Sequence, residues 1–160
     1  MIYMSLIYSY INYCNIIWSS AYECHLKPLF ILQKKAVRII NKSDYLDTSL
    51  PIFIELKLLP ISEIYKLNCL IFIFKCLKNN NFPSFRNRIL QNSSSHNYAT
   101  RNREKLKPPT VRLEICKHSF FYRSITLWND LDDITKDSNC LNYYKHQVKH
   151  MLLGKLYRGI

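Results

Sequence analysis

The stretch LFILQKKAVRII, residues 29–40, places a compact basic block in the middle of an apolar helix pattern. An α-helix turns by about 100° per residue, so residues three and four apart lie on one side. The predicted buried stripe consists of Leu29, Leu32, Ala36, Ile39 and Ile40. The predicted basic flank consists of Lys27, Lys34, Lys35 and Arg38. This flank is either the solvated side of a helix or a surface that faces a polyanion.

The apolar residues on both sides of this stretch also follow helical spacing. A first helix is predicted over residues 2–18. The helix of the quoted stretch follows a break near residues 23–25, with Pro28 in its first turn, where a missing N–H is tolerated. Residues 41–59 are predicted to form a connector with a short helical piece. A third helix is predicted over 61–78, and its run LIFIF makes it the most buried element.

Two more helices are predicted in the C-terminal part, over residues 119–131 and after a cap at Ser138 or Asn139. The only glycines are Gly154 and Gly159. Hairpin turns and phosphate-binding loops depend on glycine, because it reaches positive φ freely, so both are disfavoured. The predicted fold is mainly α: a helical bundle, then a basic extended linker, and a C-terminal helical segment.

Residues 1–22 carry no charged side chain, which is also typical of a membrane span or a signal peptide. Polar residues nevertheless form a helical stripe of Ser5, Ser9, Asn12 and Ser19. The opposite side carries Leu6, Tyr10, Tyr13, Cys14 and Ile17. A spanning helix is apolar all round, so this pattern predicts an amphipathic helix packed against protein, and no membrane partner.

The formal net charge is +12 and the estimated pI is 9.5. Between residues 86 and 123, nine basic and two acidic residues give a net charge of 9 − 2 = +7. Such an excess repels itself in the folded state and usually meets an anionic partner, although basicity can also serve solubility alone. Nucleic acid is the preferred partner, and a strand is possible at residues 98–100. The candidate phosphate-binding residues are Lys34, Lys35, Arg38, Arg101, Arg103 and Lys105.

No residue pattern predicts a catalytic or metal site. The cluster Asp130, Asp132 and Asp133 is interpreted as a solvated turn, and HQVKH (residues 146–150) lacks the glutamate of a zinc-protease motif. Six cysteines without disulfide or zinc-finger spacing indicate a reducing compartment, nuclear or cytoplasmic. No cofactor is expected in this chain.

Six blocks, in this order, resemble the C-terminal part of jockey-like LINE (non-LTR) retrotransposon reverse transcriptases. They are SLIYSYINYCNIIW, LFILQKKAVRII, LLPISEIYKLNCLIFIFK, HNYATR, SITLWNDLDDI and YYKHQVKHMLL. The resemblance implies a fragment that lies after the fingers and the catalytic palm. It also implies a thumb that grips an RNA or RNA–DNA duplex, and a parent polymerase that uses Mg²⁺. The catalytic Tyr-x-Asp-Asp motif is missing here, so the chain alone is expected to be inactive.

On this interpretation residues 1–90 form a thumb-like helical domain, residues 91–117 a basic linker and residues 118–160 a C-terminal helical segment. Two other hypotheses stay open. The chain is a structural module whose apolar helix faces dock onto upstream palm and fingers domains, or it is a decayed remnant of an element without activity.

Overall fold

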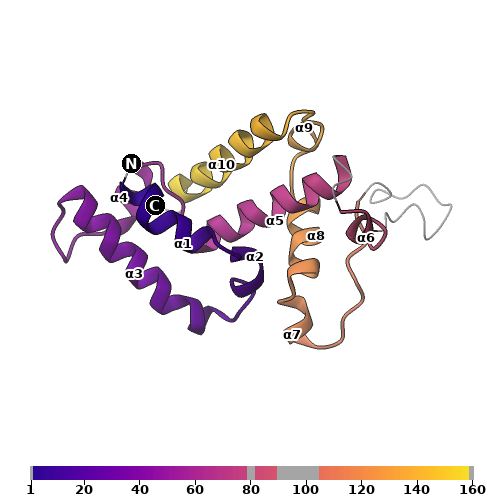
Figure 1. The fold of residues 1–160 in the computed structure, drawn as a ribbon, viewed down its shortest axis with the longest axis horizontal. Coiled ribbons are helices and arrows are strands. Elements are labelled where there is room, and N and C mark those ends of the chain that lie inside the picture. The colour runs from indigo at the N-terminus through magenta and orange to yellow at the C-terminus, as the bar shows by residue number, and fades with distance from the viewer. Residues whose placement is uncertain (1, 79–81, 90–104, 159–160) are drawn as a thin grey trace. The chain divides into compact units, whose positions relative to one another are not determined.

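The computed structural model describes residues 2–78, 82–89 and 105–158. It is mainly helical, as predicted, and contains no strand among the described residues (Figure 1). The chain divides into two compact units. Unit 1 comprises Met1–Asn68 and Val148–Ile160, and unit 2 comprises Cys69–Gln147. The division into a thumb-like domain, a linker and a C-terminal segment stays a prediction. The strand predicted at 98–100 lies outside the described residues.

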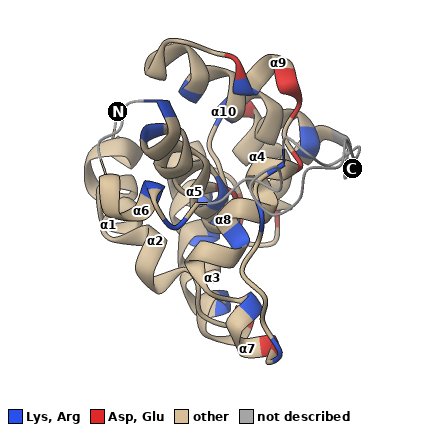
Figure 2. Cartoon of the chain, turned by 90° about the vertical axis from the view of Figure 1, so that its right-hand side faces the viewer, with Lys and Arg blue, Asp and Glu red and all other residues tan. Residues whose placement is uncertain are grey.

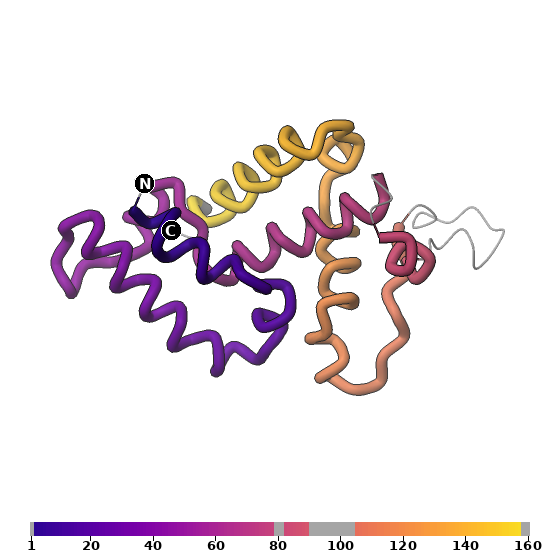
Figure 3. The backbone as a smooth tube through the Cα atoms, viewed as in Figure 1, coloured from indigo at the N-terminus to yellow at the C-terminus, as the bar shows by residue number. Residues whose placement is uncertain are grey.

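The N-terminal segment of unit 1 is broken, where the sequence predicted one helix. A π-helical turn, η1 (Met4–Tyr8), leads into α1 (Ser9–Asn12), and α2 (Asn15–Trp18) follows. The break lies at Cys14, which has a left-handed backbone with φ of 47°. Figure 3 shows the backbone leaving α2 in a short loop before α3.

The predicted polar stripe of this segment is mostly exposed: Ser5, Ser9 and Asn12 face solvent, and of the four residues only Ser19 is buried. The side that packs on the core carries Tyr3, Ile7 and Tyr8. Asn15 and Ser19 are each 1% exposed, and the Asn15 amide donates to the Ser19 hydroxyl at 2.9 Å. Asn15 also donates to the Ile11 carbonyl at 3.2 Å, which helps to compensate for the broken helix. The apolar side chains that were expected to pack against protein are exposed in this chain. They are Leu6, Tyr10, Tyr13, Cys14 and Ile17.

Helix α3 (Glu23–Asn41) begins one turn earlier than predicted. Pro28 is the sixth residue of the helix, so its placement in the first turn was wrong. A proline there removes one internal hydrogen bond, which tertiary packing of the long helix offsets. The acidic side chain of Glu23 lies in the first turn, where the helix dipole favours negative charge.

The predicted buried stripe of α3 was wrong for three of its five residues, whereas Ala36 and Ile40 are half-buried. Leu29, Leu32 and Ile39 are exposed by 43%, 59% and 76%, whereas Gln33 and Val37 are buried. Val37 belongs to the core of unit 1 with Tyr3, Ile52 and Phe53. Phe30 and Ile40 of α3 pack against this cluster, and so do Leu56 and Leu58, which follow α4. The other segments of unit 1 cover only part of the apolar surface of α3. The buried residues of this helix therefore form a line along one edge of that surface.

Gln33 explains why the buried line passes through a polar residue. Its amide nitrogen donates to the Tyr3 hydroxyl at 2.7 Å and to the Leu59 carbonyl at 3.0 Å. Its amide oxygen accepts the Ile61 N–H at 3.0 Å. Gln33 therefore joins three separate segments of unit 1, including the N-terminus of α5.

Helix α4 (Ser49–Glu55) is the predicted short helical piece of the connector, and α5 (Ile61–Lys78) matches the predicted third helix closely. Ile64, Ile73 and Phe74 of α5 are fully buried, which is consistent with its apolar sequence. The first part of this helix belongs to unit 1 and the last part to unit 2.

Unit 2 contains the short helices α6 (Pro83–Arg86), α7 (Glu114–Lys117) and α9 (Asp133–Lys136), together with α8 (Phe120–Asn129) and the first part of α10 (Leu141–Arg158). Its buried residues are mainly aliphatic, with Phe74, Trp128 and Tyr144 as the buried aromatic rings. A second, partly exposed cluster of rings lies around Phe72, which stacks on Phe82 with centroids 5.1 Å apart and meets Phe85 and Phe120 edge-on at 5.3 and 5.1 Å. Phe74 stacks on the fully buried Tyr144 at 4.2 Å, and burial raises the pKa of that phenol.

The cap of α10 differs from the prediction of Ser138 or Asn139. Helix α10 begins at Leu141, so the capping position is Cys140. The backbone N–H groups of Asn142 and Tyr143 donate to the Cys140 thiol group and hold its pKa below the ordinary value. A thiol thus occupies the position that serine, threonine, asparagine or aspartate usually takes.

Candidate nucleic-acid interface

The basic flank of α3 is a continuous stripe along one helix. Lys34, Lys35 and Arg38 lie within two turns of one another, on the flank next to the buried edge that Gln33 and Val37 form. Lys35 is exposed, whereas Lys34 and Arg38 are half-buried. The structure therefore brings these three predicted residues together on a helix that is anchored along the neighbouring edge.

Two of the three cations are held in place by local contacts. The Lys34 ammonium lies 4.2 Å from the centroid of the Phe30 ring, in a cation–π contact. The Arg38 Nε donates to the backbone carbonyl of Asp47 at 2.9 Å. Neither contact neutralises a charge, since the acceptors are an aromatic face and an amide oxygen.

The ion pairs among the described residues lie elsewhere. They join Lys66 to Glu63 at 2.7 Å, Lys117 to Glu114 at 2.7 Å, and Lys136 to Asp133 at 3.0 Å. Figure 2 shows Lys and Arg on many elements, with fewer acidic residues. Within the described part of the chain, the α3 stripe is therefore a positive surface without a carboxylate partner.

The remaining predicted residues belong to a different part of the chain. Arg101 and Arg103 lie outside the described residues. Lys105 is exposed and belongs to unit 2, whereas α3 belongs to unit 1. The grouping of the two basic sets into one surface stays a prediction.

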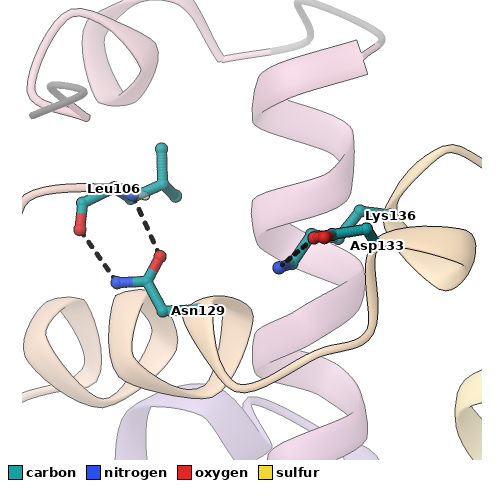
Figure 4. A network of polar contacts seen from close by, with 4 residues as sticks. All are labelled: Leu106, Asn129, Asp133 and Lys136. Atoms are coloured by element: carbon teal, nitrogen blue, oxygen red, sulfur yellow. Dashed lines mark hydrogen bonds and ion pairs between the residues drawn. The ribbon is translucent and has the colours of Figure 1, made fainter. Parts of the chain in front are cut away.

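The sequence did not single out the clamp that holds the chain beside Lys105. The Asn129 side chain accepts the Leu106 N–H at 3.0 Å and donates to the Leu106 carbonyl at 2.8 Å (Figure 4). Leu106 is only 3% exposed. Asn129 is the last residue of α8, and its bonds to both backbone groups of Leu106 have no local sequence signal, because this partner lies 23 positions away.

An open apolar groove on unit 1 was also missed as a surface. Its volume is about 450 Å³. Elements η1, α1 and α2 contribute Leu6, Ile7, Tyr10, Ile11 and Trp18. Helix α3 contributes Leu29, Leu32, Gln33 and Ala36, and α5 contributes Ile61. The sequence identified most of these side chains as apolar stripes, but it predicted that protein covers them.

The structure of residues 2–78, 82–89 and 105–158 also bears on a metal site, on the aspartate cluster and on a membrane span. No group of three histidine, cysteine or acidic residues there is placed to hold a metal ion. Asp132 precedes α9, and Asp133 pairs with Lys136, as expected for a turn-forming cluster. None of the described helices is long and apolar enough to cross a membrane. Comparisons with protein-family models, curated proteins and solved structures find no match to this chain.

Proposed function

We propose that the chain is the thumb and downstream part of a LINE-type reverse transcriptase, and that it grips an RNA or RNA–DNA duplex through the α3 stripe. The ordered sequence blocks support the parentage, and the uncompensated charge of Lys34, Lys35 and Arg38 supports the grip. The chain carries no catalytic role on this proposal. Its upstream partners are the palm and fingers.

The main observation behind the proposal is that three cationic side chains lie on one helix, α3, whose buried edge is fixed to the rest of unit 1. Helix α3 is fixed through Gln33 and Val37, while its basic flank beside this buried edge reaches solvent at Lys35. Lysine and arginine on phosphates give affinity without sequence readout, because they recognise a repeating charge. Pre-positioned cations lose less side-chain entropy on binding than freely rotating ones.

Charge reversal of the stripe tests this proposal. Changing Lys34, Lys35 and Arg38 together to glutamate should weaken binding to a blunt RNA–DNA duplex. It should also reduce the slope of log K against log salt by about three, one for each lost phosphate contact. Binding is measured by fluorescence anisotropy between low and moderate salt.

The matched control reverses three cations that already have carboxylate partners, namely Lys66, Lys117 and Lys136. It changes the net charge by the same amount and should lower duplex affinity much less. Equal losses in both triple variants would mean that only the net charge acts, and the α3 site would be rejected.

The apolar groove favours a second candidate function, a module that docks onto another protein segment. We propose an amphipathic helix with acidic flanks as the occupant. The chain as a whole carries a formal net charge of +12, so its field favours an acidic partner over a basic one. An exposed apolar groove of this kind is typical of helix-in-groove recognition.

A further inference from the structure

Unit 2 contains a small basic pocket that the duplex-binding proposal does not use. Its volume is about 230 Å³. The pocket is lined by Arg88, Lys107, Pro108, Pro109, Thr110 and Phe121. These residues come from the segment after α6, from the segment before α7, and from α8. None of them belongs to the six candidate phosphate-binding residues, although Lys107 lies in the same basic segment as Lys105.

The pocket wall is held by the Asn129 clamp. Because both backbone groups of Leu106 are bonded to Asn129, the chain is fixed one residue before Lys107. The two prolines that follow have restricted φ angles, which stiffens the wall as far as Thr110. Phe121 also lines the pocket, from the first turn of α8, a helix capped by the Ser119 hydroxyl. The backbone of the Lys107–Thr110 wall is therefore held in place.

The charged residues of the two lining segments are all cationic. Residues 82–89 and 105–113 contain no aspartate or glutamate. Glu104 and Glu114 lie directly at the two ends of the second segment, and Glu114 pairs with Lys117. They contain Arg86, Arg88, Lys105, Lys107 and Arg112. A pocket whose own segments carry five cations and no acid attracts anions.

The lining combines two kinds of chemistry. Arg88 and Lys107 offer donors to a phosphate, and arginine matches phosphate geometry in a bidentate manner. Phe121 and the proline rings offer flat apolar surface to a base or a sugar. The volume is below the roughly 300–1,000 Å³ of pockets that hold whole drug-sized ligands, so one unit of a larger ligand suits it best.

We infer that this pocket binds one nucleotide of a single-stranded RNA or DNA segment. Arg88 and Lys107 hold the phosphate, and Phe121 stacks on the base. A duplex keeps its bases paired and inside the stack, so this pocket selects unpaired strands. The inference does not depend on the α3 stripe, because every residue that it uses belongs to unit 2.

The test compares pocket variants of the full chain in binding a fluorescein-labelled oligo(dT) of eight nucleotides. Phe121→Leu removes the stacking ring and keeps an apolar side chain, and affinity should fall by about five-fold or more. Arg88→Glu should weaken binding as well. Arg112→Glu is its matched control, since Arg112 is exposed and does not line the pocket. It should lower the affinity less than Arg88→Glu does.

Two further measurements separate base stacking from phosphate binding, and the unit 2 pocket from the α3 stripe. An abasic oligonucleotide keeps the phosphates and lacks the bases, and it should bind the wild-type chain more weakly than oligo(dT). The α3 triple variant should lose much less affinity for oligo(dT) than for the duplex. Unchanged affinity of Phe121→Leu with a normal circular dichroism spectrum, or equal binding of the abasic strand, would overturn the inference. Loss of duplex binding alone in the α3 variant would leave it standing.

Discussion

At the scale of single residues, this chain gives polar and sulfur-containing side chains roles that sequence patterns assign to others. Gln33 occupies the centre of the buried line of α3 and makes three hydrogen bonds. Cys140 caps α10. In both cases the structural role depends on the groups that the side chain contacts, and it cannot be predicted from the residue type alone.

The capping thiol leads to a pH-dependent prediction. Two backbone N–H donors favour the thiolate, so Cys140 should react with iodoacetamide at lower pH than an ordinary cysteine. The midpoint of its rate against pH should lie lower in the folded chain than in the same chain in urea, as measured by mass spectrometry of the Cys140 peptide. By linkage, the thiolate cap stabilises the fold above the ordinary thiol pKa, and this contribution is lost as the pH falls through the lowered pKa. Identical midpoints in both states would show that the cap does not favour the thiolate.

At the scale of elements, the predictions succeeded where one local signal dominated and failed where distant partners chose the buried face. Helix α5 was predicted closely because Pro60 precedes it and apolar residues fill its length. The prediction for the buried side of α3 was wrong because the apolar surface of this helix is broader than the part that other segments cover. Its covered edge is set by Tyr3, Leu59 and Ile61, which lie about thirty positions away. The Asn129 clamp and the pocket of unit 2 escaped prediction for the same reason.

Helix ends in unit 1 use lysine where glycine is usual. Helix α3 ends with Lys42 at φ of 54°, and α4 is followed by Lys57 at φ of 51°. Behind Lys42, the Ser43 N–H donates to the Arg38 carbonyl at 3.0 Å. Behind Lys57, the Leu58 N–H donates to the Phe53 carbonyl at 2.8 Å. Both are Schellman ends, in which a side chain at the left-handed position is strained.

Replacing Lys42 with glycine should therefore stabilise the protein. The left-handed conformation costs a side-chain-bearing residue roughly 1–2 kcal/mol, and part of this gain is offset by the greater freedom of glycine in the unfolded chain. We expect the free energy of unfolding to rise by up to about 1 kcal/mol, measured by urea denaturation. Lys42→Ala is the control, because it removes the same charge but keeps the Cβ. A gain of the same size in the alanine variant would assign the effect to charge instead of backbone strain.

At the scale of the whole molecule, unit 1 presents two different surfaces: the cationic stripe of α3, which has no carboxylate partner among the described residues, and the apolar groove. Helix α3 contributes to each of them from different sides. A net charge of +12 keeps such a chain apart from its copies but favours any acidic partner. The two candidate functions can therefore be separated by the chemistry of the ligand that each surface accepts.

The groove predicts binding of an amphipathic helical peptide with leucines on one face and glutamates on the flanks. Trp18 lines the groove, so its fluorescence should shift when the peptide binds, and the same peptide with lysine flanks should bind more weakly. Leu32→Glu should abolish the shift, because it places a charge inside the groove. Ile39→Glu is the matched control, since Ile39 is 76% exposed on the same helix and does not line the groove. If both variants bind the peptide equally well, the groove is not its site, and duplex binding through the basic stripe remains the one proposed role of α3.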